Sequence, residues 1–222
     1  MVANQKFTVN TIDAVVAAIL AYRQNQNKIL RHSVQFLEEN QKENKQLIYD
    51  FFAENKSVPT DLRAEAESIR SSLNQRVMMN NLVGVKNSDF LADVNSILQS
   101  ETVSSSKFGL VAWSPKLFDD HVRADSEREQ VISLSIGSTY LGKVSKAIEL
   151  TWHSISATYL QSYDSFVLIG HDGAGNLINT WSKTRIDDGA RIKARVKAHK
   201  ADERFSRAKF TVLNYVKVVN EK

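Results

Sequence analysis

The chain has 222 residues but no cysteine and only two prolines. Without cysteine it forms no disulfide, no thiolate nucleophile and no cysteine-ligated zinc or iron–sulfur site. Long apolar runs are also missing, because the longest, Ala14–Tyr22, is far shorter than the roughly 20 residues of a membrane-spanning helix. No basic and then apolar leader with a cleavage site opens the chain. We therefore expect a cytoplasmic protein without membrane contact.

Glycine is scarce in the first half and frequent in the second. Gly84 is the only glycine before residue 109, and the other seven follow. Because glycine punctuates turns between strands more than it interrupts helices, this distribution predicts an α+β fold with helices first and strands later. The polar segment Glu101–Lys107 is the best linker candidate. We expect a helical domain over 1–105 that binds a partner or self-associates, a linker and connecting helix over 106–130, and a β-barrel over 131–222.

Helical spacing of apolar residues and capping residues predict the helices. Thr11 is the expected N-cap of the first helix, and Ser88 caps a short one. A long helix over 28–55 has a wholly polar middle, Glu38–Gln46, which we expect to project from the core or to contact a partner. The predicted helices are Ile12–Gln26, Lys28–Asn55, Thr60–Met79, Ser88–Gln99 and Ser114–Gln130.

From Val131 onward the chain alternates apolar and polar residues or is rich in β-branched and aromatic ones. Tight hairpin loops are expected at Asp172–Asn176 and at Asp187–Gly189. Five or six strands in about 90 residues indicate a small antiparallel barrel. The predicted strands are Val131–Ile136, Gly142–Ser156, Tyr159–Ile169, Asn176–Ser182, Ala190–Lys200 and Arg207–Val219.

The segment Arg191–Lys200, RIKARVKAHK, carries the clearest functional pattern. Its cations Arg191, Lys193, Arg195 and Lys197 alternate with apolar residues, so a strand sends all four to one exposed face. A helix would instead spread them around its circumference. Net charge is +4 for the whole chain, whereas 185–209 alone holds nine cations and four carboxylates. Such a face suits a polyanion.

Short motifs in the last ninety or so residues occur in a specific order. They are Leu141–Lys146, a tyrosine-rich strand with Tyr159 and Tyr163, the turn Asp172–Asn176 before Trp181, Asp188 and Gly189 before a basic strand ending in Val196–His199, and a last strand with Thr211–Lys217. In this order they resemble an oligonucleotide/oligosaccharide-binding (OB) module at the carboxyl ends of bacteriophage DNA-metabolism proteins. The resemblance covers about 40% of the chain. The sequence departs from the pattern before the last strand, where a glycine is expected and Arg204–Arg207 stands.

The resemblance implies an OB-like barrel that holds single-stranded DNA or RNA in a groove. Single strands bind where cations follow the phosphates and aromatic rings stack on bases. The expected binding residues are Lys183, Arg185, Arg191, Lys193, Arg195, Lys197, Lys200, Arg204, Arg207, Lys209, Tyr159, Tyr163 and Phe205; further aromatic candidates are Trp152, Trp181 and Tyr215. The predicted function is a replication or recombination accessory protein of a bacteriophage that acts in the host cytoplasm, with no enzymatic activity and no cofactor.

Each of these signals has a structural alternative. The alternating cations could form a solvated face that prevents edge pairing. Core packing is the favoured interpretation for Trp152 and Trp181, because aromatic residues fill small barrels, whereas Tyr159, Tyr163 and Phe205 are expected to be exposed.

Other functions have less support in the sequence. Histidines 121, 153, 171 and 199 have no metal-binding spacing. The adjacent aspartates 119–120 and 187–188 could be the magnesium-binding carboxylates of a nuclease, but adjacent residues of a strand point to opposite faces and Asp-Asp-Gly is an ordinary turn. The alternative to nucleic-acid binding is a protein-interaction module, a virion component or an inhibitor of a host enzyme, with the barrel as scaffold and the helices in contact with the partner.

Overall fold

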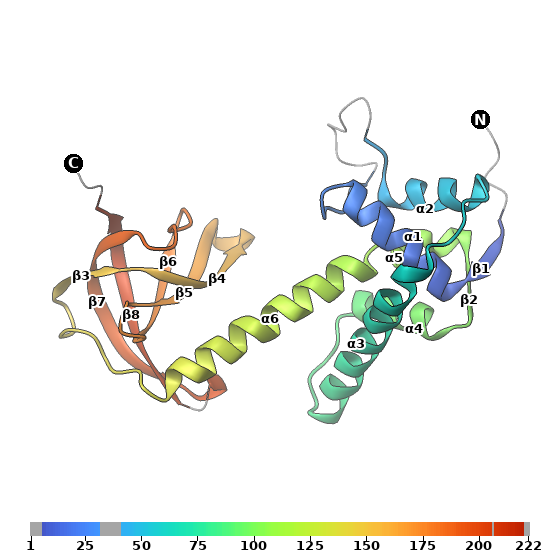
Figure 1. The fold of residues 1–222 in the computed structure, drawn as a ribbon. Helices are drawn as coiled ribbons and strands as arrows, with labels where there is room; N and C mark the ends of the chain where they lie inside the picture. The colour runs from blue at the N-terminus through green and yellow to red at the C-terminus, as the bar shows by residue number, and fades with distance from the viewer. Residues whose placement is uncertain (1–5, 32–40, 206, 220–222) are drawn as a thin grey trace. The chain divides into compact units, whose positions relative to one another are not determined.

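The computed structural model describes residues 6–31, 41–205 and 207–219. The chain divides into two compact units, unit 1 (Met1–Val122) and unit 2 (Arg123–Lys222). The division falls inside one helix, α6 (Ser114–Ser135). Helices dominate unit 1 and a sheet dominates unit 2, so the predicted α+β class is confirmed (Figure 1).

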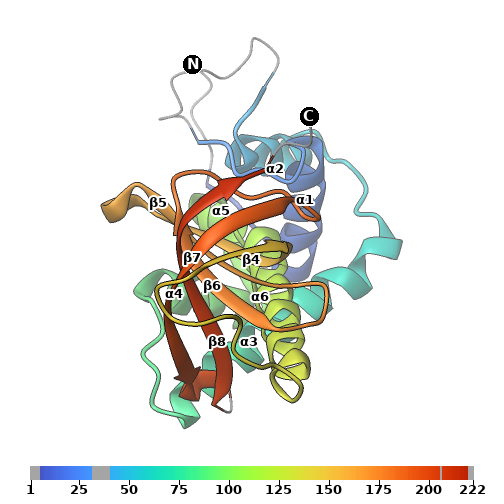
Figure 2. The same cartoon turned by 90° about the vertical axis from the view of Figure 1, so that its left-hand side faces the viewer.

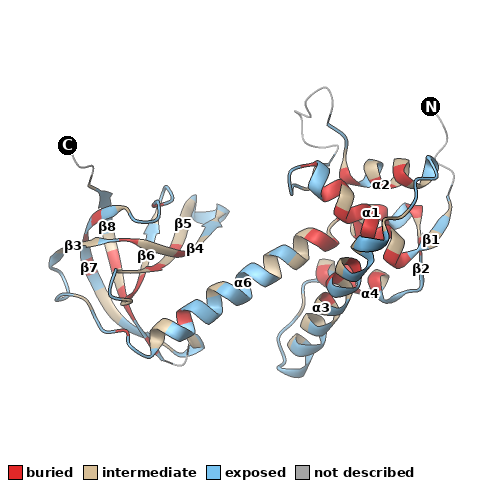
Figure 3. Cartoon of the chain, viewed as in Figure 1, coloured by how far each residue is buried: buried red, intermediate tan, exposed pale blue. Residues whose placement is uncertain are grey.

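Unit 1 is built around α1 (Thr11–Gln24), whose alanine-rich sequence lets neighbouring elements approach closely. Ten of its residues are buried, and Figure 3 shows this helix largely in the colour of buried residues. Phe108 and Phe51 complete the core beside it. The other elements are β1 (Thr8–Asn10), α2 (Asn44–Ala53), α3 (Arg63–Leu82), α4 (Asp89–Gln99), β2 (Thr102–Ser104) and α5 (Phe108–Val111).

Two predicted helix starts are wrong. Asn10, not Thr11, caps α1, because its Oδ1 accepts from the backbone N–H groups of Ile12 (2.9 Å) and Asp13 (3.3 Å). The helix predicted from Lys28 begins only at Asn44. Asn44 Oδ1 accepts from the N–H of Leu30 at 2.7 Å, which holds 28–30 outside a helix. Residues 32–40, which include the first three residues of the predicted polar middle, Glu38–Asn40, lie outside the described part of the chain.

The segment predicted as a linker belongs to unit 1 instead. Its strand β2 pairs antiparallel with β1, with Val9 opposite Val103. Val103 and Ser105 are buried. Three consecutive serines favour a loop by composition, but here Ser105 accepts from the N–H of Phe7 and closes the end of the β1–β2 ladder.

The strand predicted at Val131–Ile136 is also wrong, because α6 continues to Ser135. Val131 and Leu134 lie three residues apart, so a helix places both on one face, and both pack against the sheet of unit 2. Tertiary packing therefore overrides the strand propensity of this β-branched segment.

The sheet of unit 2 has the strand order β3-β7-β8-β6-β5-β4. Figure 2 shows β7 and β8 as its longest strands. All pairs are antiparallel except β6 with β8, which are parallel, so the prediction of a purely antiparallel sheet is wrong. The strands are β3 (Ala147–Thr151), β4 (His153–Leu160), β5 (Ser165–His171), β6 (Leu177–Ser182), β7 (Arg191–Asp202) and β8 (Ala208–Val218).

The sheet is not a closed barrel, because its edge strands β3 and β4 do not pair with each other. They are nevertheless consecutive in the chain, and only the buried Trp152 separates them. Trp152 lies against Gly170, where an added Cβ would come within 2.6 Å of its ring and 2.3 Å of the carbonyl oxygen of His153. The two edges are thus held near each other by the chain itself and by this packing.

The turns partly agree with the sequence analysis. Asp172–Asn176 connects β5 and β6 as predicted, with Gly175 at a φ of 86°. Asp187–Gly189 is a turn but not a hairpin, since β6 and β7 are not neighbours. The predicted strand Tyr159–Ile169 is interrupted by a short 3-10 turn at Gln161–Tyr163. Between β7 and β8, Arg207 has a φ of 62°, the conformation for which a glycine was expected.

Candidate nucleic-acid interface

The predicted alternation of β7 is confirmed. Its first four cations are exposed, and the residues between them, Ile192, Ala194 and Val196, are buried. Lys217 of β8 lies opposite Lys193. We call the outward-facing set Arg191, Lys193, Arg195, Lys197 and Lys217 the basic face. Two lysines directly opposite each other on an exposed sheet repel, which costs stability unless an anion lies between them.

Glu149 of β3 neutralises part of this face. Its Oε1 lies 3.0 Å from Nζ of Lys193 and its Oε2 lies 3.6 Å from Nη2 of Arg191. The hydrogen bond and charge of Lys193 lower the pKa of Glu149. Arg195 donates instead to the carbonyl oxygen of Ser145 at 2.9 Å. Because this partner is neutral, it does not offset the positive charge of Arg195. The alternative that the cations only form a solvated face therefore fits Arg191 and Lys193, which contact Glu149, better than it fits Arg195 and Lys197.

The aromatic residues of unit 2 divide differently from the prediction. Trp152 is fully buried, as expected, but Trp181 is 49% exposed, so its predicted place in the core is wrong. The reason is the side of the sheet on which it lies. Ile178 and Thr180 of β6 face the sheet's interior, and Trp181 has the opposite parity. Tyr159 and Tyr163 are exposed as predicted.

These rings gather around the turn between β4 and β5. Tyr163 meets Trp181 edge to face at 5.3 Å between ring centroids, and Tyr159 lies 5.1 Å from Phe166. We call Tyr159, Tyr163, Phe166 and Trp181 the aromatic group. The edge-to-face contact of Tyr163 with Trp181 leaves at least one face of each of these two rings uncovered by the other, which suits stacking on a further planar group.

Two of the predicted cations hold the aromatic group in place. Lys183 donates to the carbonyl oxygen of Asp164 at 2.8 Å and contacts its carboxylate at 3.3 Å. Tyr159 donates its hydroxyl hydrogen to the same carboxylate, and these bonds lower the pKa of Asp164. The guanidinium of Arg185 lies 5.4 Å from the centre of the Phe166 ring. Lys183 therefore stabilises the turn, and Arg185 packs on the Phe166 ring, whether or not a ligand is bound.

The remaining predicted residues lie near the connection between β7 and β8. A cavity of about 210 Å³ is lined there by Lys200, Arg204, Asn179 and Val212, among others. Arg204 is paired with Asp202 by two hydrogen bonds, at 3.0 and 2.6 Å, and Arg207 lies 3.9 Å from Glu203. Phe205 is half-buried against Phe210, so its predicted exposure is wrong. Lys209 is exposed at the start of β8.

The predicted cations therefore fall into two equal sets. Those that contact a carboxylate are Lys183, Arg191, Lys193, Arg204 and Arg207. Within the described residues, those that do not are Arg185, Arg195, Lys197, Lys200 and Lys209. A polyanion would meet the second set without first displacing a carboxylate.

The histidines of unit 2 stack on neighbouring rings. The rings of His153 and His171 are 5.0 Å apart, and His199 lies 4.5 Å from Tyr140. Nowhere in the described residues do three or more histidine, aspartate or glutamate side chains gather as a metal site requires. Among the helices that the structure describes, none has the length and apolar character needed to cross a membrane.

The sequence analysis names Tyr215 only as a further aromatic candidate and does not include Lys217 among the expected binding residues. Tyr215 is 75% exposed and follows Asn214, which pairs with Arg195. A signal for this was present in the sequence, because Leu213 and Val216 are three residues apart and break the two-residue period of the strand. Such a break indicates a bulge that turns an extra side chain outward.

Trp181, Asn214 and Arg195 lie on three neighbouring strands. Thr180 of β6 is opposite Leu213 of β8, so the next residues, Trp181 and Asn214, are also neighbours. Asn214 is in turn opposite Arg195 of β7. Trp181 and the basic face thus lie on the same side of the sheet, whereas Tyr159 and Phe166, which pair with each other, have the opposite parity to Trp181. No family model, no curated protein and no solved structure matches this chain.

Proposed function

We propose that unit 2 binds single-stranded nucleic acid and that the chain is a replication or recombination accessory protein. The observation that carries the proposal is the half-exposed Trp181 of β6, which lies on the same side of the sheet as the unneutralised Arg195 of β7, with β8 between the two strands. The half-exposed indole ring leaves apolar surface in water, and a ligand that stacked on it would cover that surface. A ring beside a row of cations is the arrangement that stacks a base and neutralises the adjoining phosphates.

The strand arrangement supports the same proposal. If β3 and β4 are taken as one strand bent at Trp152, the sheet has the five strands of a partly open Greek-key barrel of the OB type. In that fold the second and third strands and two flanking loops bind oligonucleotides. Here they correspond to β5, β6, the turn with Tyr163 and the connection with Arg204. The bacteriophage origin rests only on the resemblance of the sequence motifs.

In the proposed complex, bases stack on Trp181 and Tyr163 while phosphates cross to Arg195 and Lys197. Each neutralised phosphate releases counterion, so the logarithm of the affinity falls with the logarithm of salt by roughly 0.7 per contact. Duplex DNA keeps its bases stacked inside the helix, and it would engage only the cations. Selectivity for single strands therefore depends on the rings, and overall affinity depends on the charges.

The test is fluorescence anisotropy with a labelled thymidine oligonucleotide, single-stranded and duplex, at two salt concentrations. Trp181→Ala should weaken single-strand binding by roughly 1–3 kcal/mol, and Trp181→Phe should largely preserve it. Charge reversal at Arg195 and Lys197 should remove most of the salt dependence. Binding that ignores salt and all of these substitutions would refute the proposal.

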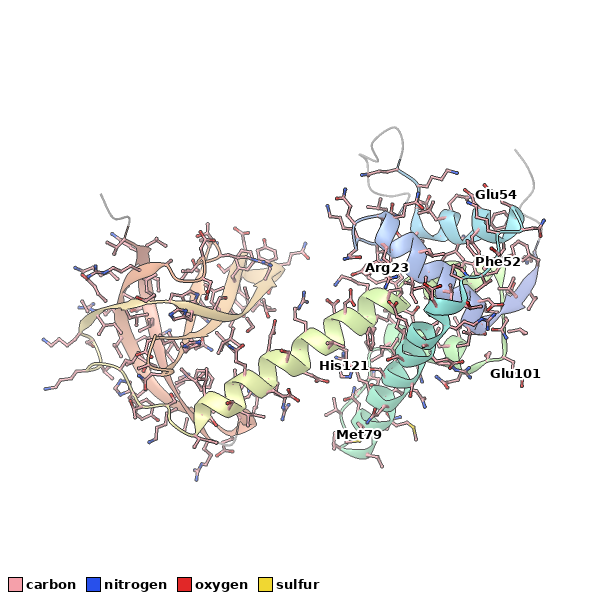
Figure 4. All side chains as sticks on the ribbon, viewed as in Figure 1. Arg23, Phe52, Glu54, Met79, Glu101 and His121 are labelled. Carbon is pink, nitrogen blue, oxygen red and sulfur yellow. The ribbon has the colours of Figure 1, made fainter. Side chains whose placement is uncertain are left out.

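A second candidate function is protein–protein contact through unit 1. The end of α3 and the residues after it expose an apolar surface formed by Met78, Met79, Leu82, Val83 and Val85, which are 52–79% exposed. Figure 4 shows Met79 near the carboxyl-terminal end of α3. The surface favours an interaction role for the helical unit, and a second copy of the chain is the simplest partner.

A further inference from the structure

Tyr215 has a backbone conformation that is costly for tyrosine. Its φ is 54°, and among the described residues it is the only non-glycine residue inside a strand with a positive φ. In the left-handed region Cβ lies close to the backbone, which disfavours every residue type except glycine. Asparagine and aspartate are disfavoured less than the others. If only stability mattered, glycine, asparagine or aspartate would be expected at position 215.

The conformation results from a bulge in β8. Lys193 is opposite Lys217 and Arg195 is opposite Asn214, so Tyr215 and Val216 together face the single residue Ala194. Val216 packs on the core of unit 2, while Tyr215 is 75% exposed. The bulge thus lets Val216 point inward and turns the tyrosine outward between Asn214 and Lys217.

The exposed ring contributes little to packing, yet its surroundings match those of a stacking side chain. Lys193, Arg195 and Lys217 of the basic face are its cross-strand and same-strand neighbours. A base that stacked on this ring would bring its flanking phosphates to those cations. Exposed residues with a strained backbone conformation are typical of sites that contact a ligand.

We propose that Tyr215 stacks on an unpaired base of a strand bound along the basic face, and that it thereby discriminates single strands from duplexes. The inference rests on the proposed function. Trp181 and Tyr215 then hold two bases of the same strand, since they lie on adjacent strands of the sheet. Duplex bases present no free face to a ring on a sheet surface, so Tyr215 adds affinity only for unpaired bases.

The backbone conformation allows a sharp test. Tyr215→Gly and Tyr215→Asn both suit the left-handed region and both remove the ring, while Tyr215→Phe retains it. We expect the glycine and asparagine variants to melt at or above the temperature of the unmodified protein. They should bind a thymidine oligonucleotide roughly 5-fold or more weakly, with duplex affinity unchanged. The phenylalanine variant should bind both as the unmodified protein does.

Crosslinking provides an independent readout. A thymidine oligonucleotide with one iodouracil, irradiated on the full-length protein, should attach to Tyr215, as located by peptide mass spectrometry. Equal single-strand affinity of the glycine variant and the unmodified protein, with Trp181→Ala still impaired, would overturn the role of Tyr215 and leave the proposed function standing. Failure of the unmodified protein to bind the oligonucleotide at low salt would overturn both.

Discussion

Oε1 of Glu149 lies 3.0 Å from Nζ of Lys193, in the middle of the basic face. The pair is exposed on a sheet surface, so water screens it and its contribution to stability is small. Its effect on the proposed binding is expected to be larger, because Glu149, the only carboxylate among the described residues of β3 and the basic face, neutralises a cation that a phosphate would contact. In the proposed complex, Glu149 therefore limits the affinity of this surface for a polyanion.

Replacing Glu149 with glutamine should strengthen binding of a single-stranded oligonucleotide. The change frees Lys193 and Arg191 for phosphates, and the salt dependence should steepen by up to roughly 0.7 per freed cation. Anisotropy titrations over a range of salt concentrations measure both quantities. Glu54→Gln is the matched control, since Glu54 lies in unit 1, where it forms an ion pair with nearby Lys56. Unchanged or weaker binding by the Glu149 variant would show that phosphates do not reach this face.

Gly170→Ala should destabilise unit 2 strongly. The added Cβ would lie 2.3 Å from the carbonyl oxygen of His153 and 2.6 Å from the ring of Trp152, and neither atom can move without opening the junction of β3 and β4. Overpacking of this kind costs about 1–3 kcal/mol or more. Amide hydrogen exchange in β4 and β5 reports the change.

Gly173→Ala provides the control for this prediction. A Cβ at Gly173 meets nothing within 4 Å, so its exchange rates should stay close to those of the unmodified protein. Equal protection of the strands in both alanine variants would mean that Trp152 is not packed as described.

The basic face could be predicted because it depends only on the alternation of side chains along one strand. The exposure of Trp181 could not, because it depends on which side of β6 is interior and on where α6 covers the other side. Val131 and Leu134 of α6 pack over Leu177, whereas Trp181 lies beyond them at the other end of the strand. These facts belong to tertiary structure, and no local pattern in LINTWS contains them.

The helices show the same limit. Ser88 caps α4 as predicted because the cap is a local hydrogen bond, from the N–H of Leu91 to Ser88 Oγ at 3.2 Å. The start of α2 was misplaced because it depends on a contact between distant residues. Asn25 and Leu30 both donate to Oδ1 of Asn44. Neither partner is identifiable from helical periodicity around Asn44.

The Asp202–Arg204 pair predicts a pH dependence for the end of β7. Hydrogen bonds from the Arg204 side chain lower the pKa of Asp202 below its ordinary value of 3.8. The folded carboxylate therefore holds its charge more strongly than the unfolded one. Its stabilisation is fully present above the ordinary pKa and is lost as the pH falls through the lowered value.

Asp202→Asn should accordingly cost less than about 1 kcal/mol at neutral pH, since Arg204 is largely exposed and the pair is screened. The difference from the unmodified protein should shrink in acid. Hydrogen exchange of the β7 and β8 amides, compared at neutral and acidic pH, measures it. Asp187→Asn removes an exposed carboxylate of the same unit and should show no such trend. A deficit that grows in acid would contradict the assigned pairing.

The apolar surface at the end of α3 predicts self-association of the chain. Leu82 and Val83 are 79% and 66% exposed, and covering them removes apolar surface from water. Sedimentation velocity should show concentration-dependent association that Leu82→Glu with Val83→Glu abolishes, while affinity for a single-stranded oligonucleotide per chain stays the same. Ile136→Glu tests specificity, because Ile136 is 91% exposed in unit 2 and should leave association intact. Association that persists in the double variant, or that Ile136→Glu also removes, would exclude the α3 surface as the specific contact. The helical unit would then need another partner to explain why so much apolar surface is exposed.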